Sequence, residues 1–193
     1  MSNPIGVLAL QGDFAKHIES LKRLRLPTKA IRWPEELNSC SGLILPGGES
    51  TTFVNLLSKT GLLDAIIMFS ENHAIMGTCA GLITLATTIV NDSMDTLGLI
   101  DLQVERNAYG RQVDSFFDTI QIPFFKNNPS FEGVFIRAPK IHTFGKHVIS
   151  LGYHKSDVVM ARNERVLVCT FHPELTRDTR VHRYFVEEMV LKK

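Results

Sequence analysis

Cysteine is scarce in this sequence, and its positions exclude two classes of small protein. Cys40, Cys79 and Cys169 are the three cysteines among 193 residues, and their spacing is wide and irregular. This spacing fits neither a disulfide framework nor a zinc-binding motif, and it agrees with a reducing compartment. The chain also lacks internal repeats, low-complexity tracts and linkers, so we expect one domain over residues 1–193.

The sequence also lacks any concentration of charge or of apolar residues. Twenty-one basic residues against twenty acidic ones leave a formal charge of +1, with no basic stripe. Nucleic acid and anionic membranes are therefore not favoured as partners. No segment joins a basic start to an uninterrupted apolar stretch, and no run reaches the roughly 18 apolar residues of a membrane span. We expect a cytoplasmic protein that acts on a small polar substrate or binds another protein.

Short apolar runs alternate with helical patterns in the first half of the chain. IGVLAL, at residues 5–10, predicts a strand, and the apolar residues of FAKHIESLKRL, at 14–24, fall on one helical face. Asp13 is a candidate N-cap for that helix. TKAIRW and SGLIL predict further strands, and a helical pattern follows residue 50. Strands separated by helices predict a mostly parallel sheet that is covered by helices on both faces.

The pattern changes after residue 96, where short runs without helical periodicity are separated by turn residues. These runs predict antiparallel strands added to the sheet, and TRVHRYFVEEMVLK, at 179–192, predicts a closing helix. The expected fold is α/β, a three-layer sandwich with a mostly parallel central sheet and antiparallel additions in the C-terminal half.

The segment IMGTCAGLITL, residues 75–85, places a cysteine in a bend built of small residues. The apolar residues before Cys79 predict the end of a buried strand, and the pattern after it predicts a helix over 80–89. The apolar face of that helix would hold Leu82, Leu85, Ala86 and Ile89. Gly77 and Gly81 remove side-chain bulk on both sides, which permits a strained turn. The pattern is the cysteine version of the G-x-S-x-G nucleophile elbow.

Two interpretations apply to a free cysteine. It is commonly a small buried hydrophobic residue, and we adopt that interpretation for Cys40 and Cys169. Cys79 differs because the first turn of a helix offers unpaired N–H groups and the positive end of the helix dipole, which favour a thiolate. We therefore interpret Cys79 as a nucleophile.

A cysteine nucleophile needs a base, and His172 is the candidate. It ends the apolar run RVLVCTF and is followed by Pro173 and Glu174. In an extended segment residues i and i+2 point the same way, so the carboxylate can reach the far ring nitrogen and orient the imidazole. The alternative is a turn whose polar residues face water. Solvent exposure is expected for the other histidines, which are His17, His73, His142, His147, His154 and His182.

The glycines of PGGES, residues 46–50, follow a predicted buried strand. They fit an ordinary turn, and they fit equally well a set of backbone N–H groups that binds an oxyanion. The cysteine elbow and the His-x-Glu segment follow this motif in that order along the chain. The three motifs together are a stronger indication of an active site than any one of them alone.

Together these motifs resemble those of class I glutamine amidotransferases, which have a flavodoxin-like fold. The segments that carry the resemblance are LILPGGEST, GTCAGLI and FHPE. Other segments are similar to one family within that class, the glutaminase subunits of pyridoxal 5'-phosphate synthase. These are GVLALQGDFAKHI, VERNAYGRQVDSF, GVFIRAPKI and FHPELTRDTRVHRYFV. The similarity covers nearly the whole chain and implies a single glutaminase domain over 1–193, without a cofactor or a metal.

The resemblance implies a role for each motif. Cys79 would attack the glutamine amide and form a γ-glutamyl thioester, with His172 as base and then acid and Glu174 orienting it. Backbone N–H groups at Gly48 and Ala80 would bind the oxyanion. Glutamine contacts are implied at Gly48, Glu49, Ser50, Arg106, Ile136 and Arg137. A zwitterionic amino acid needs a cation near its carboxylate, although each arginine also fits a surface salt bridge.

The resemblance also implies a partner, because the glutaminase leaves no chain for an ammonia acceptor. The partner would be a synthase subunit, a (β/α)8 barrel assembled into stacked hexameric rings, with one glutaminase per synthase protomer. Docking to this subunit would activate the glutaminase through a rearrangement of the turn at Gly47 and Gly48, called the glycine turn below. Pyridoxal phosphate would be its product. The alternatives are a glutaminase of another amidotransferase, a cysteine hydrolase with other substrates, and a regulatory module that has no catalytic activity.

Overall fold

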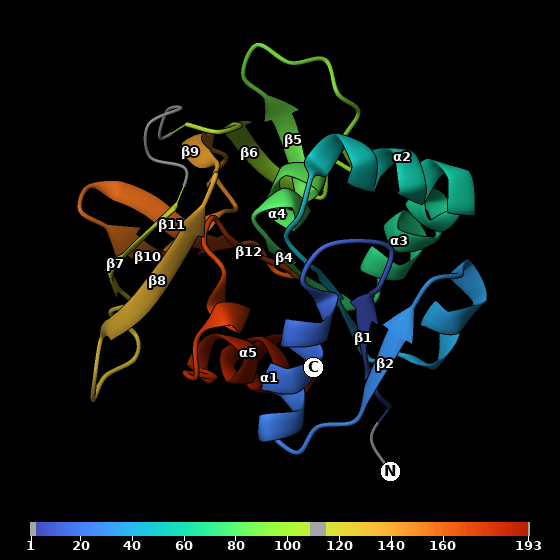
Figure 1. Cartoon of the computed structure of the whole chain (residues 1–193), viewed down its shortest axis with the longest axis horizontal. Coiled ribbons are helices and arrows are strands. Elements are labelled where there is room, and N and C mark those ends of the chain that lie inside the picture. Colours follow the sequence, from blue (N-terminus) through green and yellow to red (C-terminus); the bar gives the residue numbers. More distant parts are fainter. Residues whose placement is uncertain (1–2, 109–114, 193) are drawn as a thin grey trace.

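The computed structural model describes residues 3–108 and 115–192, which form a central sheet with helices on both faces (Figure 1). Residues 109–114, in the middle of VERNAYGRQVDSF, lie outside the described part of the chain. Among the described residues the main sheet has nine strands, in the order β2-β1-β3-β4-β12-β11-β10-β7-β8.

The main sheet has a parallel half and an antiparallel half. The parallel strands are β2 (Thr28–Ile31), β1 (Ile5–Leu8), β3 (Gly42–Leu45), β4 (Ala74–Thr78) and β12 (Val166–Cys169). The antiparallel strands are β11 (Asp157–Arg162), β10 (Ile149–His154), β7 (Ser115–Gln121) and β8 (Ser130–Ile136). The predicted parallel core and the predicted C-terminal additions are both present, and the additions make the sheet mixed.

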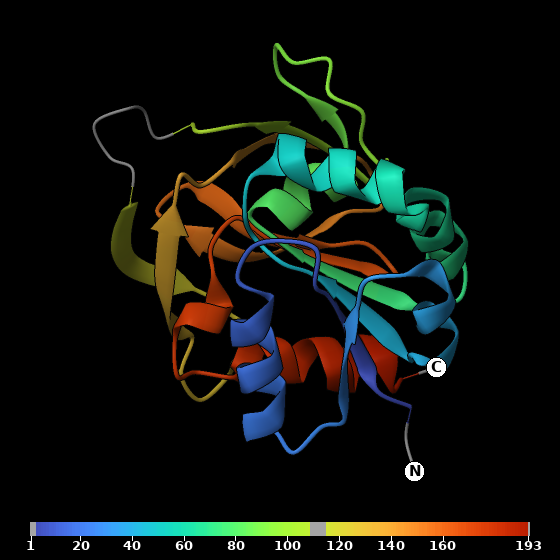
Figure 2. The ribbon, with the colours of Figure 1, turned by 45° about the vertical axis from the view of Figure 1, so that its right-hand side comes forward.

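Side chains of the parallel strands alternate between two hydrophobic cores. In β1, Val7 packs on one face and Leu8 on the other. The first core lies against α1 (Phe14–Arg23), α5 (Arg180–Tyr184) and the π-helical turn η3 (Phe185–Val190). The second lies against α2 (Ser50–Thr60), α3 (Leu62–Ser70) and α4 (Ala80–Leu85). This arrangement, visible in Figure 2, confirms the predicted three-layer α/β sandwich.

The helix predicted over 80–89 is too long. It ends at Leu85, and the chain continues as strand β5 (Ala86–Ile89), which pairs with β6 (Ile100–Glu105) in a second sheet completed by β9 (Lys140–Phe144). Threonine and isoleucine are stiff at χ1 and favour a strand. Ala86 and Ile89 are buried in the same core as Leu82. The apolar spacing therefore predicted the burial of these residues correctly and their helical conformation incorrectly.

Two short 3-10 turns and the C-terminal helix complete the part of the chain that the structure describes. The turns are η1 (Pro34–Ser39) and η2 (Pro173–Leu175). The predicted C-terminal helix is present from Arg180 and changes to π-type hydrogen bonding at Phe185. Among the described residues no single helix is long and apolar enough to cross a membrane. α2 and α3 pass that test only as a pair, which is bent by 92°.

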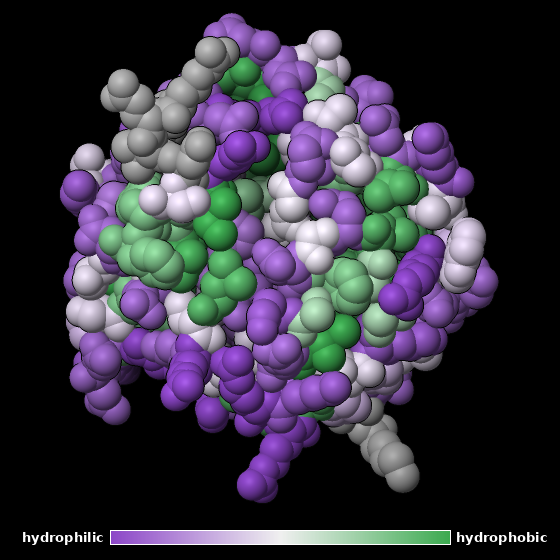
Figure 3. All heavy atoms as spheres, in the orientation of Figure 1, coloured by the Kyte–Doolittle hydropathy of each residue, from purple (hydrophilic) through white to green (hydrophobic). Residues whose placement is uncertain are grey.

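The surface around the β7–β8 hairpin is partly hydrophobic. Phe117, on β7, is 70% exposed. In the space-filling view, hydrophobic side chains gather over β8, and a second hydrophobic area lies on the other side of the same face, over the region of α2 and α3 (Figure 3). This hairpin forms the outer edge of the main sheet, opposite β2.

Two glycines allow α4 to approach the sheet. A Cβ atom added to Gly81 would lie 2.2 Å from the carbonyl oxygen of Leu45, in β3. A Cβ atom on Gly77 would lie 2.5 Å from Cδ1 of Leu85. The bend between β4 and α4 therefore depends on the absence of side chains at both positions.

Gly81→Ala should lower the free energy of unfolding by about 2 kcal/mol, because the added methyl group overpacks against a fixed backbone carbonyl. Urea denaturation would measure this loss. Gly98→Ala is the control, since a Cβ atom there meets nothing within 4 Å and the residue has a φ of +63°. It should cost about 1 kcal/mol, the penalty of left-handed backbone alone. Equal losses in the two variants would contradict the packing argument.

Candidate active site

Cys79 occupies the sharp turn between β4 and α4, two elements that lie near the middle of Figure 1. Its φ of 48° and ψ of −104° lie in a sparsely populated region for a residue with a side chain. Its N–H donates to the carbonyl of Cys169 in β12, at 2.9 Å. The predicted strained bend is therefore present. Because α4 has six residues, its dipole is weaker than that of the predicted longer helix.

His172 and Glu174 are paired as expected, although the backbone between them differs from the prediction. Nδ1 of His172 lies 2.7 Å from Oε1 of Glu174. The segment is not extended, because Pro173 begins the 3-10 turn η2 directly after the histidine. Proline fits the first position of such a turn, where its missing N–H costs nothing. The i, i+2 contact is therefore made within a turn.

The electrostatics of this pair favour an imidazolium next to a carboxylate. Burial by itself lowers the pKa of His172, but its interactions with Cys79 and Glu174, which include the hydrogen bond to Glu174, outweigh it and raise the pKa to about 10. Burial raises the pKa of Glu174, whereas the neighbouring His17 and the hydrogen bond from His172 lower it to about 2. A histidine that holds its proton at neutral pH stabilises a thiolate beside it and can later protonate a leaving group.

A cavity of about 430 Å³ opens over Cys79. Most residues selected from the sequence line it, namely Gly48, Glu49, Ser50, Cys79, Arg106, Ile136, Arg137 and His172. Glu174 and Ala80 do not line it, since both are buried behind the cavity wall. Sequence reasoning missed Asp13, Ile83 and Asn107, which also line it. Asp13 was selected only as an N-cap, and its side chain makes no capping hydrogen bond.

Strand β8 brings Ile136 to the thiol. The N–H of His172 donates to the carbonyl of Val134 at 2.8 Å, which ties β8 to the segment after β12. The thiol of Cys79 then faces the carbonyl oxygen of Ile136 at 3.7 Å. A backbone acceptor is thus placed at the edge of the cavity.

Arg106 is held at the rim of the cavity by two carboxylates. Its Nη1 donates to Asp92 at 2.7 Å, and its Nη2 lies 3.4 Å from Glu49. Glu49 is also the N-cap of α2, accepting from the N–H groups of Thr51 and Thr52 at 3.0 and 2.6 Å. Hydrogen bonds from Thr52 and Thr51 lower the pKa of Glu49 to about 2. The rim therefore carries a fixed cation and a fixed anion, as a zwitterionic ligand requires.

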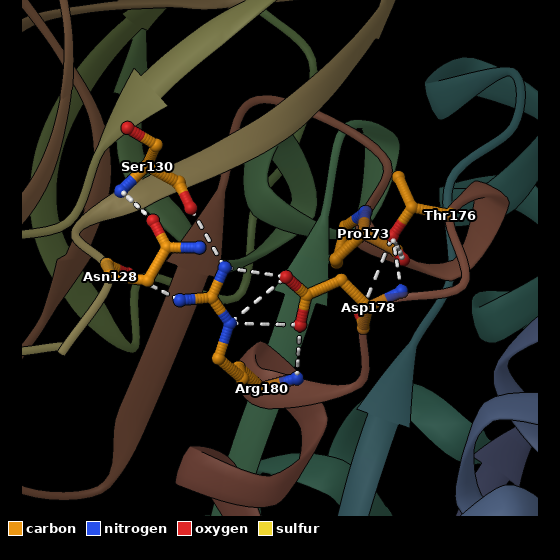
Figure 4. A network of polar contacts seen from close by, with 6 residues as sticks. All are labelled: Asn128, Ser130, Pro173, Thr176, Asp178 and Arg180. Atoms are coloured by element: carbon orange, nitrogen blue, oxygen red, sulfur yellow. Dashed lines mark hydrogen bonds and ion pairs between the residues drawn. The ribbon is translucent and has the colours of Figure 1, made fainter.

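Arg180 joins the loop between β7 and β8 to the segment that follows Glu174 (Figure 4). Its guanidinium donates to the backbone carbonyls of Asn128 and Ser130 and pairs with the carboxylate of Asp178. It also lies 4.8 Å from the ring centre of Phe125. These contacts fix the hairpin that carries Val134 and Ile136.

One group of side chains at the site has a spacing that suits a metal ion. Asp13, His172 and Glu174 place ligand atoms within 4.8 Å of one another. His172 and Glu174 are already hydrogen-bonded together, so an ion bound here would compete with that hydrogen bond.

The prediction of solvent exposure is wrong for three histidines. His17 and His182 are completely buried, and His154 is 5% exposed. His154 contacts Asp118 on the neighbouring strand at 2.8 Å, and the other two contact each other at 3.0 Å. Each finds its polar partner on a remote segment, which compensates for the loss of water and which a sequence pattern does not reveal.

The SNO glutamine amidotransferase family matches residues 7–191 of the chain. The chain belongs to this family. A relative from Oenococcus oeni, named pyridoxal 5'-phosphate synthase subunit PdxT, is 49% identical over 97% of each chain. A relative of the same name from Thermosipho africanus is 45% identical over 94% of this chain and 96% of its own. A solved glutamine amidotransferase structure has a TM-score of 0.89 and 46% identity, covering 95% of this chain and 97% of its own.

Membership in the glutamine amidotransferase family confirms the predicted enzyme class. The enzyme is a glutaminase, which hydrolyses the side-chain amide of glutamine. Its central sheet and its α/β architecture are those expected from the resemblance.

The His172–Glu174 pair should make stability depend on pH. Because the folded-state pKa of His172 is raised to about 10, its contribution is complete below its ordinary pKa of 6.5 and is lost as the pH rises toward 10. The pKa of Glu174 is lowered to about 2, so its contribution is complete above its ordinary value of 4.5 and is lost as the pH falls toward 2. The pair therefore contributes most between these two ordinary values.

Urea denaturation between about pH 7 and about pH 9 would measure the basic side of this window. The free energy of unfolding of the wild type should fall across this range. His172→Gln removes the titrating group, so its stability should fall less. Identical pH slopes in the two proteins would show that His172 is not held protonated in the folded state.

Proposed function

We propose that this glutaminase is the ammonia-producing subunit of a pyridoxal 5'-phosphate synthase. It converts L-glutamine and water to L-glutamate and ammonia, and the ammonia passes to a synthase subunit. The observation that carries the proposal is the convergence of Cys79 and His172 on one cavity, with Glu174 bonded to the histidine at 2.7 Å. Relatives that share 45–49% identity and are named pyridoxal 5'-phosphate synthase subunit support the assignment of pyridoxal phosphate synthesis as the reaction that uses the ammonia.

In the proposed mechanism the Cys79 thiolate attacks the side-chain amide carbon of glutamine. The carbonyl oxygen becomes an oxyanion, which the backbone N–H groups of Gly48 and Ala80 stabilise. When the C–N bond breaks, the His172 imidazolium gives its proton to the departing nitrogen, and ammonia and a γ-glutamyl thioester form. His172 then removes a proton from water, which attacks the thioester and releases glutamate. Glu174 keeps the imidazole oriented in both steps.

The residues at the rim suit the amino-acid end of glutamine. We assign the substrate carboxylate to the cationic side of the cavity, at Arg106 and Arg137, and the ammonium group to acceptors near Glu49 and Ile136. Gly48 and Ser50 complete the proposed contacts at the glycine turn. Asp92 and Glu49 hold Arg106 in place, which lowers the entropy lost on binding.

We assign the whole chain, residues 1–193, to one glutaminase domain that binds a barrel-shaped synthase subunit. We propose one glutaminase per synthase protomer, on stacked hexameric rings. The cytoplasm is the proposed location, because all three cysteines are free and such thiols persist in reducing compartments. Pyridoxal phosphate is then a product of the complex and not a cofactor of this chain.

Cys79→Ala should abolish glutamine-dependent pyridoxal phosphate synthesis by the complex, because the nucleophile is lost. An added ammonium salt should restore synthesis, since the acceptor site lies on the partner. His172→Asn should behave in the same way, and Glu174→Ala should be less severe because the carboxylate only orients the base. The rate of cofactor formation with each nitrogen source is the measurement.

Cys40→Ala is the matched control, because Cys40 is a buried thiol in the hydrophobic core. It should retain glutamine-dependent synthesis. Failure of ammonium to rescue Cys79→Ala would mean that the variant does not assemble or that the acceptor role is wrongly assigned. Hydrolysis of peptides or esters in preference to glutamine would favour a different cysteine hydrolase.

The chain alone should hydrolyse glutamine slowly, and the synthase subunit should activate it. The proposed cause is a rearrangement of the glycine turn, since Gly48 has a φ of +148° that glycine alone adopts readily. A missing oxyanion donor lowers turnover by about a hundred- to a thousand-fold. Glutaminase assays with and without the synthase subunit test this. Equal turnover would contradict it.

Gly47 is unsuitable for testing this switch. A Cβ atom at Gly47 would lie 2.3 Å from Cε1 of His172, so a larger residue there would displace the base itself. A loss of activity in such a variant would not report on the turn.

A further inference from the structure

Two buried histidines lie next to Glu174, and the proposed mechanism does not use them. His17 is on α1 and His182 is on α5, and both are completely buried. Nδ1 of His17 lies 3.0 Å from Nε2 of His182. Imidazole rings are seldom buried without a polar partner, so the contacts of this pair need an explanation.

His17 contacts both halves of the proposed catalytic machinery. Its Nε2 lies 3.4 Å from Oε2 of Glu174, the carboxylate oxygen that does not bind His172. The same nitrogen lies 3.2 Å from Oγ1 of Thr78, the residue before Cys79. Oε2 is fully buried and accepts no hydrogen bond from the described residues at the geometry of the structure, and Nε2 of His17, at 3.4 Å, faces it. His17 is therefore the group placed to satisfy it.

The charge on Glu174 selects the tautomer of both histidines. If Nε2 of His17 carries the hydrogen, it can donate to Oγ1 of Thr78 and also faces the carboxylate, and Nδ1 accepts from Nε2–H of His182. Nδ1 of His182 is then an unprotonated acceptor, in agreement with its lack of a partner among the described residues. The opposite tautomers would direct a lone pair at the carboxylate and leave a buried N–H of His182 unpaired, which is costly.

Both histidines are neutral in this arrangement. Burial lowers the pKa of His17 and lowers that of His182 to about 3. The ionisable groups that influence this region are His172 and Glu174 after β12, Asp13 and Arg23 at the ends of α1, and Cys169 at the end of β12. A neutral donor can hold a carboxylate without competing for the proton of His172.

We propose that His17 is a positioning residue of the glutaminase, in that its Nε2–H holds Oε2 of Glu174 and keeps Oε1 directed at His172. His182 supports it by fixing its tautomer. This inference rests on the triad assigned above. It extends the chain of contacts from Cys79 through His172 and Glu174 to α1 and α5.

The proposal predicts two effects when the donor is lost. The carboxylate gains freedom to rotate, so His172 is oriented less well and turnover falls. The pKa of Glu174 also rises from about 2, because the favourable electrostatic interaction of His17 with the charged carboxylate has been removed. Protonation of Glu174 then occurs at higher pH, and activity is lost earlier as the pH falls.

Comparison of His17→Gln with His17→Asn tests the proposal in the complex with the synthase subunit. The amide nitrogen of glutamine reaches the place of Nε2, whereas that of asparagine reaches only the place of Nδ1. His17→Asn should lower kcat by about tenfold or more at unchanged KM, the effect of one hydrogen bond to a charged group. In a plot of kcat against pH, the fall of kcat on the acid side (the acid limb) should move to higher pH in this variant. His17→Gln should retain most of kcat and the wild-type acid limb.

A purely structural role would give a different result. Both variants would then lose thermal stability and kcat together, and both acid limbs would stay in place. Equal kcat values and equal acid limbs for the two variants overturn the proposal. If His17→Asn does not fold, His182→Gln and His182→Asn make the same comparison one residue further away. Glutamine at 182 keeps the donor to Nδ1 of His17, so retention of kcat by His182→Gln alone supports the proposal, and equal kcat values overturn it.

Two controls separate this inference from the assigned function. Synthesis with an ammonium salt should be equal in all variants, which shows that assembly is intact. Cys79→Ala should have no glutaminase activity. If it remains active, the assigned function fails, whereas an inactive Cys79→Ala with indistinguishable His17 variants refutes only the positioning role.

Discussion

Burial of the Glu174 carboxylate is the constraint around which the site is arranged. A charge that is 1% exposed is stable only if hydrogen bonds replace the water that it has lost. His172 supplies one donor at 2.7 Å, and His17 faces the second oxygen at 3.4 Å. These donors come from the segment after β12 and from α1. The segments that meet at the site are therefore held together by the polar groups that surround the Glu174 carboxylate.

Sheet topology brings the remaining groups to the same place. β4 and β12 are parallel neighbours with Thr78 opposite Cys169, so Cys79 and His172 emerge from the same edge of the sheet. β3 pairs with β4 on the other side, and the glycine turn follows it. In open α/β sheets ligands bind at the carboxyl ends of the strands, and the cavity over Cys79 lies there. Residues remote in sequence thus meet because their strands are adjacent.

Local chemistry made parts of this site predictable from sequence. The strained turn at Cys79 follows from two glycines between an apolar run and a helical pattern, and the His172–Glu174 contact follows from two residues that are nearly adjacent. The end of α4 was missed because burial of Ala86 and Ile89 mimics a helical period. The burial of His17 was missed because its partners lie far away in sequence. Asp13 occupies the predicted N-cap position of α1, but its place in the cavity was missed because that depends on the fold.

The contacts of Arg180 have a consequence for how the enzyme fails. One partly exposed guanidinium ties the loop between β7 and β8 to the chain after Glu174, and Ile120, Phe131 and Phe135 of the hairpin pack into the core that also holds Val7 and Ile44. β8 is nevertheless the last strand of the main sheet and pairs within it with β7 alone. Local opening at this edge disrupts less of the core than opening of the parallel strands. Because β8 carries Ile136, which lines the cavity, such opening would inactivate the enzyme before the parallel strands unfold.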